Sequence, residues 1–99
     1  MGGLSNIGPP IFSSSLPTIS VPVNTLYKFS LPSISDPDND TFNVKVNLEA
    51  ASPFTVYSDE TFIISPKSSN SIPYSITITL TDNNKNPKSS TYTLKIMVT

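Results

Sequence analysis

The sequence contains no cysteine, histidine, tryptophan or arginine. The lack of cysteine excludes disulfides, thiolate nucleophiles and iron–sulfur clusters. The lack of histidine excludes Ser-His-Asp and Cys-His catalytic arrangements and imidazole ligands for zinc or copper. The lack of arginine removes bidentate recognition of phosphate or carboxylate. Together these absences predict that the chain is not an enzyme.

Charge is also scarce. Charged residues make up 13% of the sequence, the formal net charge is −1, and all six cations are lysines spread along the chain. A nucleic-acid-binding protein needs a clustered basic face, so we predict no nucleic-acid partner. No apolar run approaches the roughly 20 residues of a membrane-spanning helix, so we predict no direct membrane insertion.

The abundant feature is a polar chain rich in Ser, Thr, Asn and Pro, interrupted by short runs in which apolar and polar residues alternate. This period of two is typical of half-buried antiparallel strands. About seven such runs and no helical period predict an all-β fold, a Greek-key sandwich of the immunoglobulin-like or cadherin-like type. The predicted strands are Thr18–Val21, Leu26–Leu31, Phe42–Leu48, Phe54–Tyr57, Thr61–Ile64, Ser75–Thr81 and Thr91–Val98.

The chain is long enough for one domain. Residues 1–16 resemble a linker or lead-in because they combine Gly, Ser and Asn with the pair Pro9-Pro10, which favours extended backbone. Within this segment Ile11-Phe12 can form a short first edge strand. We therefore place the sandwich domain at residues 17–99.

The strongest candidate for chemistry is the acidic segment Asp36-Pro37-Asp38-Asn39-Asp40. Asp and Asn side chains are hard oxygen donors, the type that calcium binds in sets of six to eight. A second cluster, Asp82-Asn83-Asn84, follows a later strand, and the two corresponding loops of an immunoglobulin-like sandwich share one pole. We therefore predict a calcium site formed by Asp36, Asp38, Asp40 and Asp82.

The same residue types also build tight loops through Asx-turns, so a purely structural turn remains the alternative. The segment is not an EF-hand. Counted from Asp36, the sixth residue is Thr41 instead of glycine, and the twelfth is Asn47 instead of glutamate.

Three stretches carry a family resemblance: the strand Leu26–Leu31 followed by Ser35-Asp36-Pro37-Asp38-Asn39-Asp40, the run from Tyr74 to Asp82, and Ser90-Thr-Tyr-Thr-Leu-Lys-Ile. From about Pro17 to Thr99 the chain resembles the dystroglycan-type cadherin-like domains, which occur in tandem in surface and secreted proteins. The resemblance implies a seven-stranded Greek-key sandwich. It also implies that the acidic loop meets a preceding domain. A cadherin repeat carries acidic residues between the strands that correspond to Thr61–Ile64 and Ser75–Thr81. The intervening segment Ser65–Pro73 has none, so other ligands must complete any ion site.

These observations favour a non-catalytic extracellular or cell-surface module, one unit of a tandem array that serves structure or adhesion. Its partners would be neighbouring domains of the same chain or another surface protein, with calcium stiffening the joint. One alternative is a module that binds glycan or protein through its loops or a β-face. Another is a fibre subunit that uses residues 1–15 for strand addition.

Overall fold

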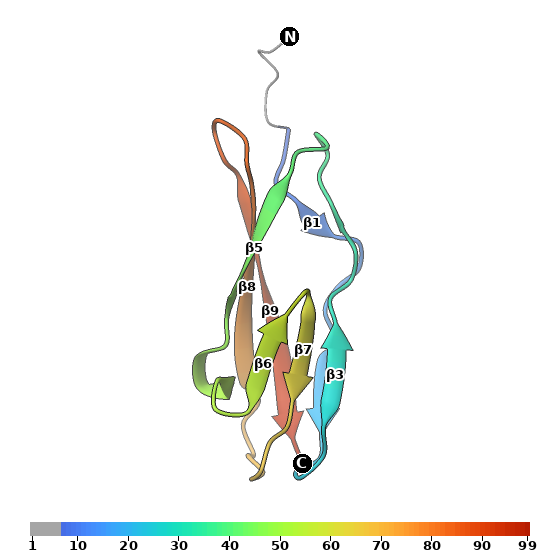
Figure 1. Cartoon of the computed structure of the whole chain (residues 1–99), viewed down its shortest axis with the longest axis vertical. Helices are drawn as coiled ribbons and strands as arrows, with labels where there is room; N and C mark the ends of the chain where they lie inside the picture. Colours follow the sequence, from blue (N-terminus) through green and yellow to red (C-terminus); the bar gives the residue numbers. More distant parts are fainter. Residues whose placement is uncertain (1–6) are drawn as a thin grey trace.

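The computed structural model describes residues 7–99 as an elongated β-sandwich of 54 × 19 × 19 Å (Figure 1). One sheet has four strands in the order β2-β9-β8-β5, and the opposite sheet has three in the order β3-β7-β6. A short pair, β1-β4, lies beside them toward the upper end in Figure 1. The strands are β1 (Ile11–Phe12), β2 (Thr18–Val21), β3 (Tyr27–Ser30), β4 (Ile34–Ser35), β5 (Phe42–Asn47), β6 (Thr55–Ser58), β7 (Thr61–Ile64), β8 (Tyr74–Asp82) and β9 (Ser89–Val98).

The predicted fold class is confirmed. The chain changes sheet between β2 and β3, between β3 and β5, between β5 and β6 and between β7 and β8, which gives the Greek-key arrangement. All seven predicted strands are present, with ends that differ by at most two residues.

Three details differ from the sequence prediction. β2 pairs with β9 in parallel, whereas the other paired strands are antiparallel. β4 lies between the predicted strands Leu26–Leu31 and Phe42–Leu48, where no strand was expected, and it pairs with β1. A 3-10 turn, η1 (Glu49–Ala51), follows β5 and buries Ala51.

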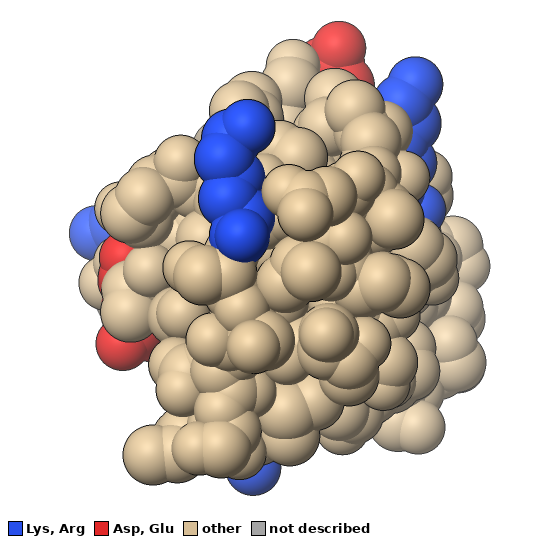
Figure 2. Space-filling model, turned by 90° about the horizontal axis from the view of Figure 1, so that it is seen from below, with Lys and Arg blue, Asp and Glu red and all other residues tan. Residues whose placement is uncertain are grey.

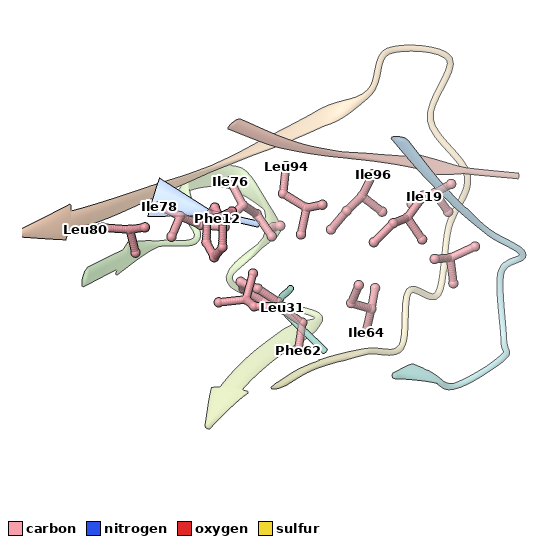
Figure 3. Packing of buried hydrophobic residues seen from close by; sticks show 13 residues of the cluster. Phe12, Ile19, Leu31, Phe62, Ile64, Ile76, Ile78, Leu80, Leu94 and Ile96 are labelled. Atoms are coloured by element: carbon pink, nitrogen blue, oxygen red, sulfur yellow. The ribbon is translucent and has the colours of Figure 1, made fainter. Parts of the chain in front are cut away.

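The core lies between the two sheets, where the alternation turns every second side chain inward. In β8 the buried residues Ile76, Ile78 and Leu80 alternate with the half-buried residues Thr77, Thr79 and Thr81. In Figure 3 Ile76 and Ile78 lie on one side of the core and Phe62 and Ile64 on the other, with Leu80 farther along β8. The rest of the cluster is Phe12, Ile19, Val21, Leu31, Ala51, Leu94, Ile96 and Val98.

The β1 residue Phe12 belongs to this core, although it lies in the segment expected to lead into the domain. Its side chain is 6% exposed, and its ring packs edge-on against that of Tyr92 at a centroid distance of 4.7 Å. The chain therefore passes from the β1–β4 pair to β2 at the edge of the four-stranded sheet. This crossing places residues 7–12 next to the loops at the upper end.

Candidate functional site

The β4–β5 loop is folded around the carboxylate of Asp36. Oδ1 of Asp36 accepts hydrogen bonds from the backbone N–H of Asp38 at 2.8 Å and of Asp40 at 3.2 Å. The carbonyl oxygen of Asp36 accepts a third from the N–H of Asn39 at 3.0 Å. Asn39 closes the turn with φ of 57°, in the left-handed region that asparagine tolerates better than most residues. The Asx-turn expected from these residue types is thus present.

The β8–β9 loop is built in the same way around Asp82. Oδ1 of Asp82 accepts hydrogen bonds from the N–H groups of Asn84 and Lys88, both at 3.2 Å. Asp82 is the last residue of β8, and its side chain is only 2% exposed. The carboxylate therefore sits at the base of the loop.

Side-chain amides join the two loops. Nδ2 of Asn84 donates to Oδ2 of Asp40 at 3.1 Å. The backbone N–H of Asn83 donates to the carbonyl of Thr41 at 2.9 Å, and its Nδ2 donates to the Thr41 hydroxyl at 3.0 Å. The two loops therefore lie side by side at the upper end of Figure 1, as the topology predicted. We call this end the acidic pole, defined by residues 36–41 and 82–88.

Three of the four predicted ligand residues meet at the acidic pole. Asp36, Asp40 and Asp82 each place one carboxylate oxygen within 4.8 Å of the others. Asp36 is 9% exposed, and its Oδ2 is buried without a hydrogen-bond partner. Two ionised carboxylates at about 5 Å repel each other by about 3 kcal/mol at an effective dielectric constant of about 20. A cation bound between these carboxylates would offset the repulsion.

The structure places the fourth predicted residue elsewhere. Oδ2 of Asp38 accepts hydrogen bonds from the backbone N–H groups of Ile7 at 2.9 Å and of Gly8 at 3.5 Å. Asp38 is not part of the converging set. Sequence reasoning also gave Thr41 no part in the site. Thr41 directly follows the acidic segment, and its carbonyl and hydroxyl oxygens accept the hydrogen bonds from Asn83.

The opposite end of the sandwich has few charged side chains at its surface. Figure 2, which views the molecule from that end, shows a mainly uncharged surface with a few lysines and, toward its margins, a few acidic residues. An open depression of about 260 Å³ lies there, lined by Asn24, Thr25, Leu26, Ser65, Pro66 and Lys67. Its only charged lining residue is Lys67. In the described residues, no helix is long and apolar enough to cross a membrane.

Comparison with solved structures supports the sandwich fold. A nucleoside hydrolase-related hypothetical protein from Saccharophagus degradans, associated with carbohydrate metabolism, superposes with a TM-score of 0.73 at 18% identity, over 96% of this chain and 26% of that one. An endo-fucoidan hydrolase from glycoside hydrolase family 107 superposes with a TM-score of 0.62 at 17% identity, over 99% of this chain and 15% of that one. The chain thus spans about a quarter or less of these larger proteins, and the likeness shows the fold alone.

No curated protein matches the chain. Residues 7–95 match the family described as "Bacterial Ig domain". The match covers most of the chain and supports the immunoglobulin-like part of the expected resemblance, but it does not extend to the narrower dystroglycan-type cadherin-like family. Together with the two-sheet topology, it shows that this chain belongs to the bacterial Ig domain family.

Proposed function

We propose that this domain is a non-catalytic extracellular module that works as one structural or adhesive unit in a series of domains, and that calcium binds at its acidic pole. One observation carries the calcium part: Asp36, Asp40 and Asp82 converge within 4.8 Å while the buried Oδ2 of Asp36 has no partner. Asp36 and Asp40 belong to the β4–β5 loop and Asp82 ends β8 at the base of the β8–β9 loop, so a bound ion would join the two loops.

The three carboxylates are the type of ligand that calcium prefers, but they are too few to fill its coordination shell. Calcium takes six to eight oxygen ligands, and carboxylates bind it with one oxygen or two. Asp36, Asp40 and Asp82 supply part of such a shell, and water or a preceding domain would supply the rest. The acidic pole would then resemble half of the interdomain site that a cadherin-like arrangement implies.

The shape of the domain suits a place in a series. Ile7 lies at the upper end of the long axis, whereas Thr99 lies at the lower end, where its N–H donates to the carbonyl of Val21 (Figure 1). A unit whose two connections leave from opposite ends adds its full length to a tandem chain. The acidic pole would face the domain on the N-terminal side.

Thermal unfolding with calcium and with chelator tests the calcium part. A ligand bound only by the folded state stabilises it by RT ln(1 + [L]/Kd), which is about 2.7 kcal/mol at 100 times Kd. For a domain of this size that corresponds to a rise of at least about 10 °C in Tm. Asp36→Ala and Asp82→Asn should remove the rise, whereas Asp59→Asn, a carboxylate outside the cluster, should keep it. An equal calcium response in all four proteins would refute the site.

A second candidate function is glycan binding on the outer face of the four-stranded sheet. The strand register aligns hydroxyl side chains across β8 and β9, with Thr77 opposite Thr93 and Thr79 opposite Thr91. Lys45 extends the second of these rows onto β5. The two solved structures compared above belong to proteins associated with carbohydrates. Chemical-shift changes of these threonines on addition of neutral or sulfated oligosaccharides would support this function, and unchanged spectra would exclude it for the sugars tested.

Strand addition in a fibre is a weaker proposal. Ile11 and Phe12 pair with β4 of the same chain, and the side chain of Phe12 lies in the core. Donating this segment to another subunit would require removing Phe12 from its own core. Residues 1–6, the remainder of the segment expected to pair, lie outside the described residues.

A further inference from the structure

The segment that enters the domain, residues 7–12, is fastened to the acidic pole and to β9. Oδ2 of Asp38 holds the N–H groups of Ile7 and Gly8. Farther along, the hydroxyl of Ser90 donates to the carbonyl of Pro10 at 2.5 Å, and the N–H of Phe12 donates to the hydroxyl of Tyr92 at 3.3 Å. The path of the chain is therefore fixed up to Ile7, the outermost of these contacts.

Asp38 is the only one of these holding side chains that belongs to the acidic pole. Packing supports the same contact, because a Cβ atom at Gly8 would lie 3.4 Å from Cγ of Pro37, the residue before Asp38. The entering segment thus passes close against the β4–β5 loop. A Cβ atom at Gly8 would therefore be in van der Waals contact with this loop.

Asp36 links this contact to the carboxylate cluster. Its Oδ1 accepts from the N–H of Asp38 at 2.8 Å, and its Oδ2 is buried without a hydrogen-bond partner. The two oxygens belong to one planar group. A cation bound at Oδ2 would therefore also fix the orientation of Oδ1, and with it the backbone position from which the Asp38 side chain extends.

We propose that Asp38 is a positioning residue, which holds the chain segment entering the domain through the amides of Ile7 and Gly8. We also propose that a cation bound by Asp36, Asp40 and Asp82 strengthens this hold. The first statement stands on the hydrogen bonds alone, and the second rests on the proposed calcium site. Together they assign Asp38 to the joint with whatever precedes Ile7, and not to the ion.

Replacing Asp38 should have a different effect from replacing an ion ligand. Loss of a ligand weakens ion binding, and loss of a positioning residue frees the entering segment while ion binding persists. A preceding domain held through Ile7 would then change its angle and mobility when Asp38 is replaced. Calcium would act on the joint through Asp36 and the loop backbone.

Amide hydrogen exchange measured by NMR on the full chain, together with calcium titration calorimetry, tests both statements. We expect Asp38→Ala to speed the exchange of the Ile7 and Gly8 amides by about tenfold, because a hydrogen bond to a charged group is lost. The Asp38→Asn variant keeps an acceptor oxygen and should retain most of the protection. Calcium affinity should change by less than about threefold in both variants. Unchanged exchange at Ile78 and Leu94 serves as the control for an intact core.

The outcomes separate the two statements from each other and from the calcium proposal. Equal exchange of the two amides in wild type and Asp38→Ala would overturn the positioning role. A loss of calcium affinity in Asp38→Ala as large as in Asp36→Ala would make Asp38 a ligand and overturn it as well. Faster exchange in Asp38→Ala without any calcium binding by the wild type would uphold the positioning role and refute the calcium site. Calcium binding that leaves the two amides unaffected would overturn the coupling.

Discussion

Replacing Asp36 by asparagine should stabilise the domain in the absence of calcium and abolish its stabilisation by calcium. In the wild type an oxygen of Asp36 lies within 4.8 Å of oxygens of both Asp40 and Asp82. At about 5 Å and an effective dielectric constant of about 20, each ionised pair contributes about 3 kcal/mol of repulsion. The substitution removes both pairs at once.

The asparagine also fits the hydrogen bonds of the loop. Its Oδ1 can still accept from the N–H groups of Asp38 and Asp40, and its Nδ2 would replace the unpartnered Oδ2 and donate to the neighbouring carboxylates. Two effects reduce this gain. The backbone amides of Asp38 and Asp40 exchange a charged acceptor for a neutral one, and solvent near the half-buried Asp40 already weakens the repulsion that the substitution relieves. We therefore expect a net gain of about 1–3 kcal/mol, well below the full repulsion.

Urea unfolding in chelator and in millimolar calcium measures both effects. Asp38→Asn is the matched control, because it makes the same charge change in the same loop at a carboxylate outside the cluster. The expected result is a higher urea midpoint in chelator for Asp36→Asn only, with no further rise on adding calcium. An Asp36→Asn protein less stable than the wild type in chelator would refute the reasoning that the cluster stores repulsion.

Two further predictions concern the fold. Phe12→Ala should lower the free energy of unfolding by about 3–5 kcal/mol, because the ring is buried against Tyr92. Urea unfolding measures this loss, and an effect below about 1 kcal/mol would support a domain that begins at residue 17. Glu60→Gly should raise stability by about 1 kcal/mol, because Asp59 and Glu60 occupy a two-residue hairpin turn with φ of 51° and 62°. An unchanged or lower Tm for Glu60→Gly would show that the turn is not strained.

The strands were predictable because their signal is local. Alternation along β5 and β8 shows which side chains face the core, whatever the partner strand. The same alternation does not depend on strand direction, so the parallel pairing of β2 with β9 was not predictable from it. The two-residue strand β4 has too few residues for a period, and it exists because β1 lies beside it.

The amino-acid sequence by itself determined that the chain folds as a β-sandwich and that its oxygen-rich side chains gather in two loops. Only the tertiary structure decided which aspartates converge at the candidate ion site and which one binds backbone amides. Asp36, Asp38 and Asp40 alternate along the chain and look equivalent in sequence, but the turn at Asn39 and the passage of residues 7–8 give them different surroundings. Asp36 and Asp40 meet Asp82 across the pole, whereas Asp38 binds the entering backbone. The physical reason is that a carboxylate's role depends on the donors and charges near it, and here residues distant in the sequence supply many of them.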